Sequence, residues 1–313
     1  MQPYFLLILG TLILLGGGKA LVDGAASIAA MAGIRTGIIG LSIVAFGTSA
    51  PELLVSINSA IKGNSDLAIG NVIGSNIANL GLVLGVSGLI YPILIRRSHL
   101  RLELPIMIVS CILFFMVCLD AKISFREGLF LTSLFLCFVF FLFWKSHSDK
   151  LRGRVLDQEE FDGIKIYPWI TSISLLVLGA LGLYFGSKIL VNSAITISKS
   201  YGISERIIGI TFIAIGTSLP EMTASVYASF SKKTDLAIGN ILGSNILNIL
   251  SIIGITSLIH PISIGEEFLK QDFYWLLGIS LVLIPLMKSK MRISKLEGGI
   301  LLGIYAAYLI FIL

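Results

Sequence analysis

The sequence predicts an all-α membrane protein with ten transmembrane helices, arranged as two inverted five-helix repeats with both termini outside (N-out/C-out). Three observations lead to this prediction. Of the 313 residues, 56% are hydrophobic and only 13% are charged, whereas a soluble domain carries about 25% charge. Apolar runs of bilayer-spanning length, roughly 18 residues or more, recur along the chain. Finally, two long segments are near-copies of each other, 169 residues apart.

Ten apolar runs are long enough to be spans. They are continuous, whereas the strands of a membrane barrel alternate apolar and polar residues over about ten positions. Helices are therefore expected at 4–30, 37–61, 67–90, 102–119, 126–144, 168–198, 205–230, 236–259, 272–287 and 296–313.

The loop charges predict the orientation, because cytoplasmic loops carry an excess of Lys and Arg. With the N-terminus outside, six of the 23 Lys and Arg residues fall in outside loops and two fall within spans, which leaves fifteen inside. The six are Lys62, Lys122, Arg126, Lys199, Arg206 and Lys270, and the two within spans are Lys19 and Lys188.

Each repeat holds five spans, and an odd number makes the second copy enter the membrane from the opposite face. The expected units are a first five-helix repeat at 1–146, a cytoplasmic linker at 147–166 and a second repeat at 167–313. The duplicated signature segments cover 40–90 and 209–259. The linker is too short for a folded domain.

The most informative duplication places an acid inside an apolar run. Residues 47–52 read GTSAPE and residues 216–221 read GTSLPE. Ionisable residues at membrane depth are costly and mark ion pathways. The proline before each glutamate lacks an N–H, which frees the carbonyl four residues earlier. Thr48, Ser49, Thr217 and Ser218 add hydroxyls beside Glu52 and Glu221.

The next helix of each half adds polar groups on one face. DLAIGNVIGSN at 66–76 recurs as DLAIGNILGSN at 235–245. Four-residue spacing aligns Ser75 with Asn79, and Ser244 with Asn248. Glycines at 70, 74, 239 and 243 are expected to let this helix approach the glutamate helix closely. Oxygen-only ligands of this kind suit hard cations such as Ca²⁺ or Na⁺.

Together, the GTSxPE and GNxxGSN motifs resemble the Na⁺/Ca²⁺ exchanger family of the calcium/cation antiporter superfamily, prokaryotic type. The resemblance covers both halves. It implies alternating access around one central site, with three Na⁺ exchanged for one Ca²⁺.

The resemblance also implies the ligands. Ca²⁺ is expected between Glu52 and Glu221, with backbone oxygens of Thr48 and Thr217. Na⁺ sites are expected to use the same glutamates, and the middle of the cluster is expected to hold two asparagines. The further residues implied are Ser49, Ser75, Ser218 and Ser244, the carbonyls of Ala45 and Ala214, and Asn79 with Asn248.

The expected function is therefore a plasma-membrane antiporter for Ca²⁺ and Na⁺, without a cofactor, a nucleic-acid partner or an obligatory protein partner. Two alternatives stay open at this point: a Ca²⁺/H⁺ antiporter and a cation channel. An enzyme is not expected, since the sequence shows no nucleophile–base arrangement or HExxH motif.

Two further expectations concern residues outside the motifs. Asp66 and Asp235 stand at predicted helix starts and are expected to be N-caps, with cation attraction at the mouth as the alternative. Glycines at 16–18 and at 179, 182 and 186 are expected to let the first and sixth spans slide against the rest.

Overall fold

The computed structural model describes residues 2–151, 164–201 and 214–312, and this part of the chain is almost entirely helical. Within it, nine helices are long and apolar enough to cross a membrane. Only the end of the expected seventh span, 205–230, is described, because residues 205–213 lie outside these ranges. The expected linker at 147–166 likewise lies only partly within them.

The described elements follow one another in the same order in both halves. The first half holds α1 (Gln2–Ala32), α2 (Thr36–Ile39), η1 (Gly40–Val44), α3 (Ala45–Ile61), α4 (Ser65–Ala78), η2 (Asn79–Val83), α5 (Leu84–Ile90), β1 (Ile93–Leu94), η3 (His99–Glu103), α6 (Leu104–Val117), β2 (Lys122–Ile123) and α7 (Phe125–Leu151). The second holds α8 (Trp169–Ser200), α10 (Ala214–Thr217), α11 (Leu219–Phe230), α12 (Thr234–Leu247), η6 (Asn248–Ile253), α13 (Gly254–Ile259), β3 (Ile262–Ser263), η7 (Phe268–Asp272), α14 (Phe273–Lys288), η8 (Ser289–Met291), β4 (Arg292–Ile293) and α15 (Lys295–Ile312).

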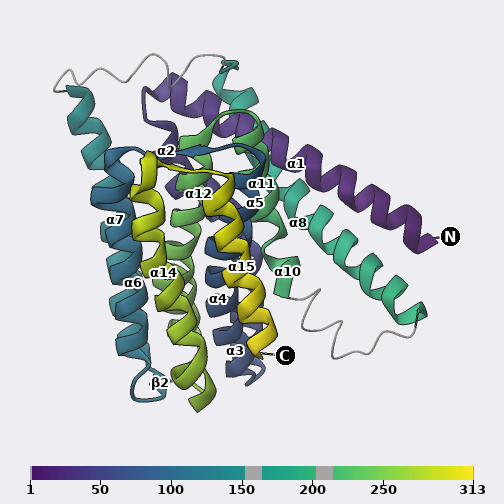
Figure 1. Cartoon of the computed structure of the whole chain (residues 1–313), viewed down its shortest axis with the longest axis vertical. Coiled ribbons are helices and arrows are strands. Elements are labelled where there is room, and N and C mark those ends of the chain that lie inside the picture. The colour runs from purple at the N-terminus through teal and green to yellow at the C-terminus, as the bar shows by residue number, and fades with distance from the viewer. Residues whose placement is uncertain (1, 152–163, 202–213, 313) are drawn as a thin grey trace.

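The two helices that carry the GNxxGSN motif lie at the centre of the bundle (Figure 1). For the helix from Ser65 to Ile90, 72% of the most apolar 18-residue stretch is buried, and for the helix from Thr234 to Ile259 the share is 89%. The corresponding share for α7 and α8 is only 22%. One continuous apolar core joins Ile73 and Leu80 of the first half to Ile241 and Ile249 of the second.

Four short strands connect the halves crosswise. β1 pairs antiparallel with β4, with Ile93 opposite Ile293, and β2 pairs with β3, with Ile123 opposite Ile262. β1 and β3 are equivalent in the two repeats, since they are separated by 169 residues. Each therefore pairs with the late strand of the other repeat. We call the two ends of the bundle the β1–β4 end and the β2–β3 end.

The late strands lead into matching helix caps. The backbone N–H of Ser124 donates to Glu127 Oε2 at 2.7 Å, and that of Ser294 donates to Glu297 Oε2 at 3.0 Å. Both are the reciprocal half of a capping box. The shift from an offset of 169 to 170 occurs just before β4, where the turn η8 precedes the strand.

The glycines of the first and sixth spans face each other. A Cβ on Gly17 would lie 2.7 Å from Leu183 N, and one on Gly179 would lie 2.3 Å from Leu21 N. α1 and α8 accordingly run side by side, tilted away from the other helices (Figure 1). These glycines let α1 and α8 pack on each other, rather than forming the contact with the rest of the bundle that the sequence suggested.

The expectation that Asp66 and Asp235 are N-caps is wrong. α4 begins at Ser65 after Asn64, and α12 begins at Thr234 after Lys233. Neither helix has a side-chain cap hydrogen bond, and both acids lie in the first turn.

Candidate functional site

The two glutamates of the duplicated motif are both completely buried. Glu52 lies on α3 and Glu221 lies in the first turn of α11. The hydroxyl of Ser49 donates a 2.7 Å hydrogen bond to Glu221 Oε1. Residues from the two copies of the motif, 172 positions apart, therefore meet at one place.

The backbone around the two glutamates differs between the halves. α3 runs without interruption through Pro51, so the missing proline N–H leaves the Gly47 carbonyl without its helical partner. In the second half, the helix is divided at Ser218 (φ −88°, ψ 2°), between α10 and α11. Pro220 there lies at the start of α11, where an N–H has no intrahelical acceptor.

The paired asparagines mark another irregularity. Asn79 begins the π-helical turn η2 and Asn248 begins the π-helical turn η6. Such wide turns are rare and frequently occur at functional sites. The side-chain amide of Asn248 donates to Asn76 Oδ1 at 3.3 Å, which links α12 to α4.

The remaining candidate residues lie on neighbouring elements. Ser75 and Ser244 are buried on α4 and α12. Thr217 is partly buried at the end of α10, and Ala214 begins this short helix, which packs against α4. The Ala45 carbonyl accepts a 3.2 Å hydrogen bond from the Thr48 hydroxyl. α3 contacts η6, and α11 contacts η2, so each glutamate helix meets the π-helical turn of the other half.

Sequence reasoning missed a pair of bracing asparagines. Asn71 Nδ2 donates to the Glu52 carbonyl at 3.2 Å and to Ser56 Oγ at 3.0 Å. In the second half, Asn240 Nδ2 donates to Ser225 Oγ at 2.9 Å. The Thr48 hydroxyl lies 3.3 Å from Asn240 Oδ1, to which it donates across the halves. Because both members and their serine partners are separated by 169 residues, the repeat offset alone could have identified them.

The four motif glycines do not act as a matched set. A Cβ on Gly239 would lie 2.3 Å from the Gly37 carbonyl oxygen, and one on Gly243 would lie 2.4 Å from that of Leu41. A Cβ on Gly70 would lie 3.6 Å from the Phe268 ring, and one on Gly74 would meet no described atom within 4 Å. The close approach is therefore that of α12 to α2 and η1, rather than to the glutamate helix.

Many buried oxygens in this region make no hydrogen bond within the described part of the chain. Buried polar atoms normally have partners, and a concentration of acceptors without donors fits a cation. No group of three His, Cys, Asp or Glu residues occurs among the described residues, so the set is two carboxylates with neutral oxygens. The oxygens are both of Glu52, Oε2 of Glu221, the hydroxyls of Ser75, Ser218 and Ser244, and Oδ1 of Asn79 and Asn248.

Comparison with known families agrees with this donor set. The sequence model for "Sodium/calcium exchanger protein" matches residues 3–144 and 171–313. The chain belongs to the sodium/calcium exchanger family. It is 37% identical to the "Putative antiporter CaxA" of Alkalimonas amylolytica, over 96% of this chain and 95% of the relative. It is 32% identical to "Sodium/calcium exchanger MaX1" of Methanosarcina acetivorans, over 98% of this chain and 97% of the relative.

Solved structures give the same result for the fold of this exchanger-family member. The sodium-calcium exchanger NCX_Mj, soaked with zero Na⁺ and Ca²⁺, superposes with a TM-score of 0.83 at 28% sequence identity. The match covers 97% of both chains. The resemblance inferred from GTSxPE and GNxxGSN is confirmed, and the chain is a multi-span membrane antiporter of this family.

Proposed function

We propose that this protein exchanges Na⁺ for Ca²⁺ by alternating access at a single site shared by its two halves. The observation that carries the proposal is the burial of Glu52 and Glu221 beside each other's motif, with Ser49 of one copy bonded to Glu221 of the other. A cation held by both carboxylates would be released only when the surrounding helices rearrange.

The proposed ligands are the twelve residues expected from the sequence. Ca²⁺ binds between the two carboxylates with the backbone oxygens of Thr48 and Thr217. Na⁺ uses the same carboxylates with four hydroxyls and two carbonyls, and the paired asparagines lie between them. The supporting observations are the burial of these groups and their lack of donors within the described residues.

The charge of the site predicts electrogenic exchange. Two ionised glutamates give −2, and the neighbouring asparagines add nothing, so one Ca²⁺ neutralises the site. Three Na⁺ would leave a charge of +1, which makes the Na⁺-loaded step sensitive to voltage. Each elementary charge that crosses the membrane contributes about 2.3 kcal/mol per 100 mV.

The proposed topology has ten spans in the plasma membrane, two inverted five-helix repeats at 1–146 and 167–313, and both termini outside. The crosswise pairing of β1 with β4 and β2 with β3 supports the inversion, because equivalent strands lie at opposite ends. Under this topology, the β1–β4 end and the linker at 147–166 face the cytoplasm.

The test uses the full chain in proteoliposomes loaded with Na⁺. An outward Na⁺ gradient should drive ⁴⁵Ca²⁺ uptake, and an inside-positive potential should accelerate it, because net positive charge leaves as Ca²⁺ enters. Uptake driven by a pH gradient without Na⁺ would favour a Ca²⁺/H⁺ antiporter. Ca²⁺ entry that needs no counter-ion gradient would favour a channel.

A further inference from the structure

A buried ionic cluster at the β1–β4 end joins the two halves. Asp235, in the first turn of α12, is only 6% exposed. Its Oδ2 lies 2.6 Å from Arg96 Nε and 3.7 Å from an Arg35 guanidinium nitrogen. Both arginines belong to the first half, one between α1 and α2 and the other between β1 and η3.

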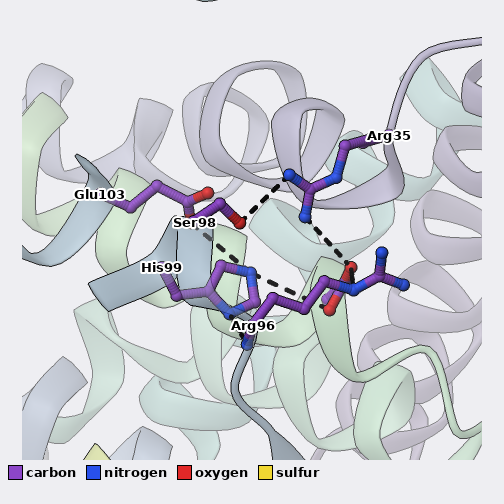
Figure 2. Close-up of polar contacts among 6 residues, drawn as sticks. Arg35, Arg96, Ser98, His99 and Glu103 are labelled. Carbon is purple, nitrogen blue, oxygen red and sulfur yellow. Dashed lines mark hydrogen bonds and ion pairs between the residues drawn. The ribbon is translucent and has the colours of Figure 1, made fainter. Parts of the chain in front are cut away.

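Other side chains hold this cluster in place (Figure 2). Arg35 donates to Ser98 Oγ at 3.1 Å, and the backbone N–H of Arg96 donates to His99 Nδ1 at 3.1 Å. Because Nδ1 accepts this bond, a neutral His99 carries its proton on Nε2. Nε2 lies 3.9 Å from Asp235 Oδ1 and 3.7 Å from Glu103 Oε2. The acid is therefore surrounded by donors on the first-half side.

The equivalent place at the β2–β3 end lacks these cations. The counterpart of Asp235 is Asp66, which is exposed, and the counterpart of Arg96 is Gly265. The two counterparts are still neighbours, since a Cβ on Gly265 would lie 3.3 Å from Asp66 Oδ1. His99 corresponds to Phe268, which cannot donate a hydrogen bond. The same backbone arrangement thus carries an ion pair at one end only.

The cluster is also coupled to the site through α12. This helix starts at the ionic cluster and carries Asn240 and Ser244 before Asn248 begins η6. Its backbone touches that of α2 near Gly37, beside the arginines. A movement that opens the β1–β4 end by separating α12 from the first half must break the Asp235 ion pairs.

We propose that Asp235, Arg35 and Arg96 form a latch that keeps the β1–β4 end closed, with no equivalent at the β2–β3 end. This rests on the proposed alternating access. The latch makes the conformation that is closed at the β1–β4 end the favoured one. Transport then includes a step in which the latch breaks and re-forms.

Hydrogen–deuterium exchange of the full chain in lipid nanodiscs tests the latch. Asp235→Asn and Arg96→Gln should each raise exchange of segments 93–99 and 234–240 by about tenfold, and the double variant should add no more, because the two residues act as one pair. Arg96→Lys keeps the charge and should retain most of the protection. Asp66→Asn is the matched control and should leave both ends unchanged.

A gain-of-function variant separates a latch from general support of the fold. Gly265→Arg places a cation beside Asp66 and should lower exchange of segments 64–70 and 262–268, and Asp66→Asn should cancel this effect. Wild-type exchange in Asp235→Asn and Arg96→Gln, or additive effects in their double variant, would overturn the proposal. Absence of Na⁺-driven Ca²⁺ uptake by the wild-type chain would overturn the proposed function instead, since the exchange experiment needs no transport.

Discussion

The two halves carry the same motifs, yet they differ in the backbone at the glutamate and in the charge at the helix end. α3 is continuous through Pro51, whereas the second copy is broken at Ser218. Asp66 is exposed, whereas its counterpart Asp235 is buried among arginines. The residues that repeat meet in one central site, and those that do not repeat distinguish its two ends. The duplication therefore defines what is bound, and the departures from it define which way the site opens.

The largest expected effect concerns the repeated part of this comparison. Glu52→Gln and Glu221→Gln should each reduce Na⁺-driven ⁴⁵Ca²⁺ uptake to background, because each removes half of the site charge. The losses should be equal although one glutamate lies on a continuous helix and the other follows a break.

Glu297→Gln is the control for these variants, because Glu297 is also a buried glutamate but caps α15 away from the site. Its uptake per folded protein should match the wild type. Substantial uptake in either of the two site variants would remove that glutamate from the site.

An intermediate effect should appear on stability at the glycines that do not match. Gly239→Ala places a Cβ 2.3 Å from a backbone oxygen, whereas Gly70→Ala meets only an aromatic ring at 3.6 Å. Overpacking typically costs about 1–3 kcal/mol. Thermal unfolding in detergent should show a lower Tm for Gly239→Ala only. Equal shifts would mean that the close packing of α12 on α2 does not distinguish the halves.

The smallest expected effect concerns the bracing asparagines. Asn240→Ala should raise the KM for Ca²⁺ by about tenfold, as is typical when a group that orients a ligand is lost, because Asn240 holds Thr48 across the halves. Asn71→Ala should have a weaker effect, since its described bonds stay within the first half. Initial rates of uptake against Ca²⁺ concentration measure both. An unchanged KM in Asn240→Ala would show that its bond to Thr48 does not position the site.

The sequence predicted the parts of this protein that depend on local pattern and on the repeat. Apolar length located the spans, and the offset of 169 was enough to link Glu52 to Glu221. The sequence did not predict that Gly239 packs on α2, because an apolar stripe does not specify which neighbour it meets. Nor did it predict the environment of Asp235, since Arg35 and Arg96 approach it from segments far away in the chain. The crosswise strands were missed because each is only two residues long.

The central claim is that one cation site is shared by the two halves. Equilibrium dialysis of the purified full-length chain against ⁴⁵Ca²⁺ tests it directly, with Na⁺ as competitor. The account predicts one Ca²⁺ bound per chain, displaced by Na⁺, and loss of that Ca²⁺ in either single variant, Glu52→Gln or Glu221→Gln. Two Ca²⁺ per chain, with each variant losing only one of them, would contradict it and would indicate a separate site in each half.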